Sequence, residues 1–70
     1  MNRRPFIVRK WSQADQAWPV HDRATGARIG TVTTAGPWQP YTATAPDGST
    51  HTERSRFMAC CWLLARASAI

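Results

Sequence analysis

The C-terminal part of the chain carries the clearest pattern of apolar and polar positions. Residues 55–67 contain no Gly, Pro or β-branched residue and are rich in Ala, Leu, Met and Arg, which favour helix. Ser55 can accept a hydrogen bond from an amide of the first turn and so cap the helix. Phe57, Cys61 and Leu64 recur at the i, i+4, i+7 spacing of one helix face, beside Met58. This pattern predicts a helix that packs through that face.

The opposite side of the predicted helix mixes charged and apolar residues. Arg56, Ala59, Leu63 and Arg66 lie roughly opposite Phe57, and Trp62 lies at the flank of this side. We therefore expect Trp62 and Leu63 to be partly exposed. An exposed Trp–Leu pair indicates a contact with a partner or a second copy of the chain.

Short runs rich in β-branched and aromatic residues alternate with turn residues upstream of the helix. We expect strands at residues 5–11, 18–22, 29–34, 38–44 and 50–53, separated by turns at 23–28, 36–37 and 45–49. Regularly spaced turns favour an antiparallel meander. The predicted fold class is α+β: a small antiparallel β-meander of three to five strands with one C-terminal helix packed on one face.

The third predicted strand does not alternate strictly. Ile29 and Val32 would point to opposite faces of a regular strand, because successive side chains alternate. Gly30 lies between them and favours a β-bulge, which would return both side chains to the core.

Length and composition indicate one domain, residues 1–70. A 43% share of hydrophobic residues and a 19% share of charged residues are ordinary for a globular protein. No apolar run approaches the roughly 20 residues of a membrane span. The N-terminus shows no secretory signal. We therefore expect a cytoplasmic protein that does not enter a membrane.

The positive charge is concentrated at the N-terminus. Arg3, Arg4, Arg9 and Lys10 occur in residues 1–10 without an acid and so contribute four of the five formal net charges. We expect residues 1–5 to form a flexible basic arm. Such an arm is a common electrostatic contact for nucleic acid, although it can also serve only to keep a chain soluble.

The cysteine and histidine residues do not form a recognisable metal or catalytic motif. Cys60 and Cys61 are adjacent in the predicted helix, and their spacing from His21 and His51 is unlike that of a zinc module. His21 and the neighbouring Asp22 point to opposite faces of a strand. His51 and Glu53 share a face, which we interpret as a solvated strand surface. We expect no metal, no cofactor and no enzymatic activity.

The second half of the chain resembles a family of DNA-binding domains. Gly36-x-Trp38-x-x-Tyr41, then Asp47-Gly48, then Ser55-x-Phe57-x₄-Trp62-Leu63 is similar to the β-β-β-α arrangement of arm-binding domains of tyrosine recombinases and of plant Apetala-type domains. The resemblance implies that the outer face of the sheet enters the major groove of DNA. Three positions have counterparts among the DNA-contacting residues of these families: Trp38, Arg54 and Arg28.

Two hypotheses of function follow from these patterns. The first is a small nucleic-acid-binding protein, with DNA expected rather than RNA. Its expected contact residues, taken from the basic arm and the sheet, are Arg3, Arg4, Arg9, Lys10, Arg28, Trp38 and Arg54. The alternative is a protein-interaction module or homodimer that uses Trp62, Leu63 and the edge of the sheet.

Overall fold

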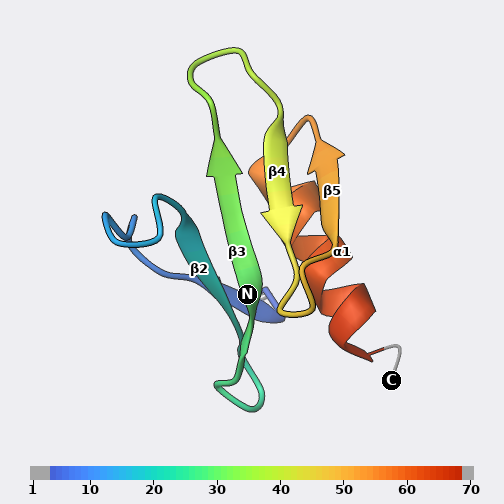
Figure 1. Cartoon of the computed structure of the whole chain (residues 1–70). Helices are drawn as coiled ribbons and strands as arrows, with labels where there is room; N and C mark the ends of the chain where they lie inside the picture. Colours follow the sequence, from blue (N-terminus) through green and yellow to red (C-terminus); the bar gives the residue numbers. More distant parts are fainter. Residues whose placement is uncertain (1–3, 69–70) are drawn as a thin grey trace.

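The chain folds into one antiparallel sheet with a helix across one face (Figure 1). This computed structural model describes residues 4–68. The elements in chain order are β1 (Phe6–Val8), β2 (Trp18–Asp22), β3 (Arg28–Thr34), β4 (Tyr41–Thr44), β5 (Thr50–Glu53) and α1 (Arg56–Ser68). The strands are ordered β1-β2-β3-β4-β5, so every strand pairs with its neighbour in sequence. The predicted α+β meander with one C-terminal helix is therefore confirmed.

The predicted turn after β4 and the predicted N-cap of α1 both form the expected hydrogen bonds. Between β4 and β5, the Gly48 amide donates to the Ala45 carbonyl at 2.9 Å, and the backbone of Gly48 has φ +93°. This left-handed conformation suits glycine, which has no Cβ to clash. At the start of α1, the Met58 amide donates to the Ser55 hydroxyl at 3.0 Å, which satisfies one of the unpaired first-turn amides.

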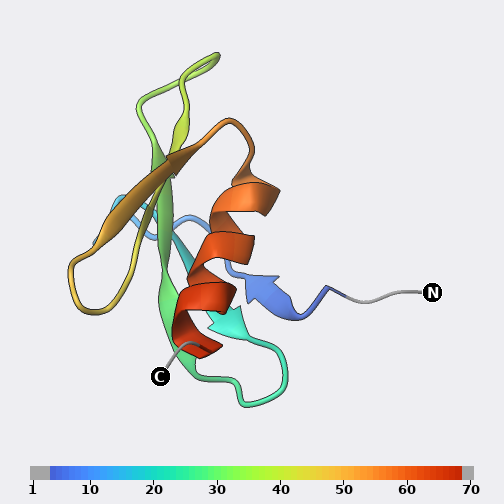
Figure 2. The ribbon, with the colours of Figure 1, turned by 90° about the vertical axis from the view of Figure 1, so that its right-hand side faces the viewer.

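The helix covers one face of the sheet and leaves the other face open (Figure 2). The side chains of Val20, Val32 and Ala43 are fully buried beneath α1, one from each central strand. Neighbouring residues in each strand therefore point to the side of the sheet opposite the helix. Among the described residues, no helix is long and apolar enough to cross a membrane.

The prediction of which helix face packs on the sheet was wrong. Ala59, Cys60 and Leu63 are fully buried, whereas Phe57 is 43% and Met58 50% exposed. Ala59 and Leu63, expected to point outward, therefore face the core. The reason is steric: the small Ala59 and Cys60 let the helix approach the sheet closely, and Leu63 fits over Gly30.

Gly30 creates the space for that approach. Val20 pairs with Gly30 and His21 with Arg28, so Ile29 is the extra residue of a bulge in β3. Ile29 and Val32 are both buried, as the bulge prediction required. A Cβ at Gly30 would lie 2.6 Å from Cδ2 of Leu63 and 2.5 Å from the Thr44 carbonyl oxygen. Glycine is therefore needed both for its backbone and for its lack of a side chain.

Candidate nucleic-acid interface

The open face of the sheet is lined by threonine. Thr31 pairs with Thr44, and Thr33 pairs with Thr42, across β3 and β4. The same two β4 residues pair with Thr50 and Thr52 of β5. This hydroxyl-rich, uncharged surface was missed from the sequence. The signal was the motif Thr-x-Thr, which occurs in three of the strands at residues 31–33, 42–44 and 50–52.

Trp38 lies on the loop that projects beyond β3 and β4 (Figure 1). It is not part of β4, which begins at Tyr41, so the predicted strand at 38–44 was too long. Pro40, which cannot donate to a strand ladder, immediately precedes β4. The Trp38 side chain is fully exposed, at 101% of its reference area.

The backbone around Trp38 forms a tight turn. The Gln39 amide donates to the Gly36 carbonyl at 3.2 Å, with Pro37 and Trp38 at the two central positions. The φ angle of Trp38 is +66°. Because Pro37 has a fixed negative φ, this combination defines a type II turn, whose third position normally holds glycine. A bulky residue there is strained, and it makes no compensating packing contact.

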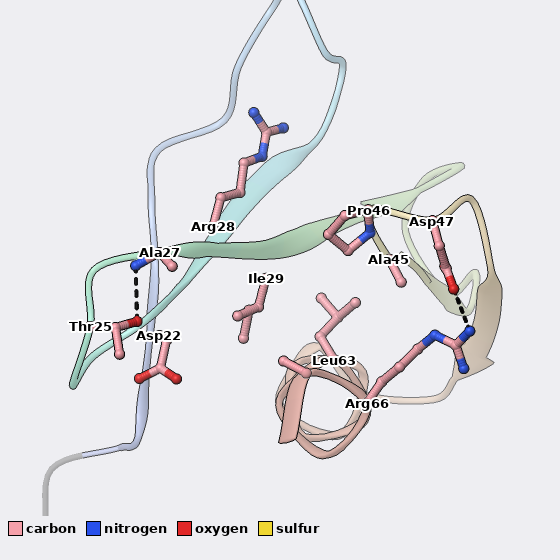
Figure 3. A pocket seen from close by; sticks show the side chains of 11 residues that line it. Asp22, Thr25, Ala27, Arg28, Ile29, Ala45, Pro46, Asp47, Leu63 and Arg66 are labelled. Atoms are coloured by element: carbon pink, nitrogen blue, oxygen red, sulfur yellow. Dashed lines mark hydrogen bonds and ion pairs between the residues drawn. The ribbon is translucent and has the colours of Figure 1, made fainter. Parts of the chain in front are cut away.

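The expected cationic residues of the sheet and its loops lie on several different segments of the chain. Arg28 points away from the helix (Figure 3) and donates to Asp15 at 3.1 Å. Arg9 follows β1, and its amide donates to the Pro19 carbonyl at 2.8 Å. Lys10 is exposed next to it, and Arg54 is exposed in the connection between β5 and α1. Within residues 4–68, only Arg28 of these four forms an ion pair.

The basic arm lies in part on the other side of the sheet. Arg3, an expected contact residue, lies outside the described residues. The guanidinium of Arg4 lies 5.1 Å from the centre of the Phe57 ring on the helix. The Arg4 carbonyl accepts a hydrogen bond from Nε of Arg23 at 2.6 Å. The structure therefore places Arg4 beside the helix and apart from Trp38 on its projecting loop.

A cavity of about 620 Å³ lies near the C-terminal half of α1, at the end of the molecule opposite the Trp38 loop (Figures 1 and 3). Its walls are mainly apolar and include Ile29, Ala45 and Leu63. At its rim, Arg66 donates to Asp47 at 2.5 Å and to the Ser49 hydroxyl at 2.8 Å. The hydrogen bond from Arg66, with others from Ser49, lowers the pKa of Asp47 from 3.8 to about 2. This ion pair fastens the β4–β5 turn to the helix.

The surface of β5 next to the helix carries a histidine–carboxylate pair. Nε2 of His51 lies 2.6 Å from Oε2 of Glu53, and the His51 ring stacks on Trp62 with centroids 5.1 Å apart. Both residues lie on the helix side, and their side chains are 40% and 30% exposed, so this strand face is only partly solvated. Leu63 is fully buried, so it is not the exposed contact residue that the alternative hypothesis expected. Trp62 remains only partly exposed.

The two cysteines differ in their environments. Cys60 is fully buried, and this burial raises the pKa of its thiol from 9.0 to about 11. Cys61 is half-buried and free. Within residues 4–68, no three His, Cys, Asp or Glu side chains are grouped closely enough to hold a metal ion.

Comparison with known proteins identifies no relative. No protein-family model, curated protein or solved structure matches the chain significantly. The resemblance to recombinase arm-binding and Apetala-type domains therefore stays a prediction, and function has to be argued from the geometry.

Proposed function

We propose that the protein binds nucleic acid through the open face of the sheet and the loop that carries Trp38. The observation that carries this proposal is the fully exposed indole at a strained turn position. Strained backbone conformations of bulky residues cluster at functional sites. An aromatic side chain held in water can stack on a base, and every base offers a π-face to it.

The surroundings of Trp38 support this use. Pro37 and Pro40 restrict the loop, so little conformational entropy remains to be lost when the indole binds. The Thr34 hydroxyl, at 3.2 Å from the Gly36 carbonyl and 3.3 Å from the Pro40 carbonyl, can donate to either one and so hold the base of the loop. The Thr33 hydroxyl donates to the Gln16 carbonyl at 2.9 Å, but the other threonine hydroxyls of the open face can donate to phosphate and sugar oxygens without adding charge.

The charge balance favours an anionic ligand. The whole chain has nine Lys and Arg against four Asp and Glu. Arg9, Lys10 and Arg54 form no ion pair within the described part of the chain, so their charges are available to phosphates. Contacts of this kind supply affinity and depend steeply on salt, but they do not read sequence.

The proposal is tested by titrating a fluorescent oligonucleotide with the protein at two salt concentrations. Single-stranded DNA, duplex DNA and RNA of the same sequence form separate arms. We expect binding at low salt that weakens as salt rises. Trp38→Ala should weaken binding to a single strand roughly 5- to 150-fold, the equivalent of about 1–3 kcal/mol per stacked base.

A matched pair of charge variants controls for net charge alone. Arg54→Gln should reduce the slope of log K against log salt by about 0.9 on duplex DNA. Arg23→Gln removes the same charge from the β2–β3 loop and should leave the slope unchanged. Absence of binding to all three nucleic acids at low salt would overturn the proposal. An equal reduction of the salt slope by the two variants would show that binding depends on net charge alone and not on the position of Arg54.

A further inference from the structure

The helix has a second apolar stripe that the sheet covers only in part. This helix flank consists of Phe57, Met58, Cys61 and Leu64, the same residues whose spacing in the sequence marks an apolar face. Phe57 is 43% and Met58 50% exposed, while Cys61 and Leu64 are half-buried. The buried face of Ala59, Cys60 and Leu63 lies around the helix from it. Most of the circumference of α1 is therefore apolar, which is unusual for a helix that packs on one partner only.

The position of the sheet leaves the helix flank open. The helix packs mainly on β3, β4 and β5. On the β1 side, the Phe57 ring meets the Phe6 ring at 5.6 Å between centroids. Phe6 is buried by this arrangement, but Met58, one residue further along α1, lies beyond the sheet's reach. The exposed part of the helix flank, Phe57 and Met58, thus lies near the β1 edge of the sheet, while Cys61 and Leu64 pack partly against the core.

The charges around the N-terminal end of the helix flank are positive. The guanidinium of Arg4 lies over Phe57 at 5.1 Å, and Arg56 precedes it in α1, with its own guanidinium 5.2 Å from the Trp18 ring. The first turn of α1 contains no acid, so the positive end of the helix dipole adds to these charges. One acid, Asp22, pairs with Phe6 in the sheet, but it lines the cavity near the C-terminal half of α1 and not the N-terminal end of the helix flank.

We propose that the helix flank docks an acidic amphipathic helix of another protein. Apolar side chains of that helix would cover Met58, Cys61 and Leu64 at matching i, i+4, i+7 positions. Its acidic residues would meet Arg4 and Arg56. A second copy of this chain is a poorer fit, because α1 itself carries cations and no acid. This surface is separate from Trp38 and Arg54, so it adds a protein contact to the proposed nucleic-acid contact.

The test uses a fluorescein-labelled helical peptide with leucine at i, i+4 and i+7 and glutamate at its exposed positions. A peptide with lysine in place of every glutamate is the control. We expect saturable binding of the acidic peptide by fluorescence anisotropy, weakening as salt rises, and no binding of the lysine peptide. Met58→Glu should weaken binding roughly tenfold or more, since it removes apolar contact and adds a like charge. Circular dichroism checks that this variant folds.

A charge swap keeps the proposal separate from folding and from nucleic-acid binding. Arg56→Glu should weaken the acidic peptide roughly three- to tenfold and improve the lysine peptide. Arg66→Glu makes the same change on the other side of α1, outside the helix flank, and should leave both peptides unaffected. Equal binding of the two peptides, or binding of neither, would overturn the proposal. A dimer in analytical ultracentrifugation that Met58→Glu dissolves would also overturn it, because the occupant would then be a second copy.

Discussion

Replacing Trp38 by glycine should leave the fold at least as stable while it removes the proposed stacking residue. The Trp38 side chain is fully exposed, so its loss forfeits no packing. Its φ of +66° costs a non-glycine residue about 1–2 kcal/mol, and glycine releases that strain. Against this, glycine adds about 0.5–1 kcal/mol of backbone entropy to the unfolded chain. The balance predicts a free energy of unfolding that is unchanged or higher by up to about 1.5 kcal/mol.

Urea and thermal unfolding followed by circular dichroism measure this balance without relying on tryptophan fluorescence. For a domain of this size, the expected gain raises the melting temperature by up to roughly 10 °C. Trp38→Ala keeps the positive φ and should show no such gain, so it serves as the matched control. If Trp38→Gly lowered the free energy of unfolding by more than about 1 kcal/mol, Trp38 would have to pack against the domain. The strained backbone and exposed indole of Trp38 would then no longer support a role in binding.

Three further predictions concern the core and the ion pair at the helix. Leu63→Ala should cost about 2–5 kcal/mol by creating a cavity, and Phe57→Ala clearly less because Phe57 is 43% exposed; denaturant titration that ranks them in reverse would contradict the helix orientation. Gly30→Ala should cost on the order of 3 kcal/mol through its clash with Leu63, seen as a large fall in melting temperature; a neutral effect would argue against the close approach. The pKa of Asp47 is lowered from 3.8 to about 2, so the ionised carboxylate stabilises the folded protein fully above pH 3.8, and this contribution is lost as pH falls toward 2. Arg66→Gln should therefore flatten the dependence of the free energy of unfolding on pH between these values. An unaltered pH dependence would contradict the ion pair.

The strands and turns were predictable because their signals are local. Gly26, Gly48 and the residues around them set turns whichever way the rest of the chain folds, and β-branched runs then define the strands. The packing face of α1 was not predictable from periodicity, because the helix has two apolar arcs. Phe57 and Leu64 dominate the pattern, but the sheet packs against the arc of Ala59, Cys60 and Leu63. The arc that faces the sheet depends on the fit of the Leu63 side chain over Gly30, and these two residues are distant in sequence.

The candidate site was predicted in part. Exposure of Trp38 could be suspected from its neighbours Pro37 and Pro40, yet the sequence was interpreted as a strand because Trp and Tyr41 favour one. The positive φ of Trp38 depends on the three-dimensional course of the loop and has no sequence signal of its own. Ion pairs that join distant segments, such as Arg28 with Asp15, depend in the same way on the completed sheet.

The order of the strands has a consequence for the speed of folding. Each strand pairs with the next one along the chain, so every hairpin can form after closing only a short loop. Proteins with such low contact order fold quickly for their sheet content, and we expect folding on the order of milliseconds. The contact between Phe6 and Phe57 joins the first strand to the C-terminal helix, residues 51 positions apart in the chain. It is therefore expected to form late, so that weakening it would mainly accelerate unfolding while leaving the folding rate almost unchanged.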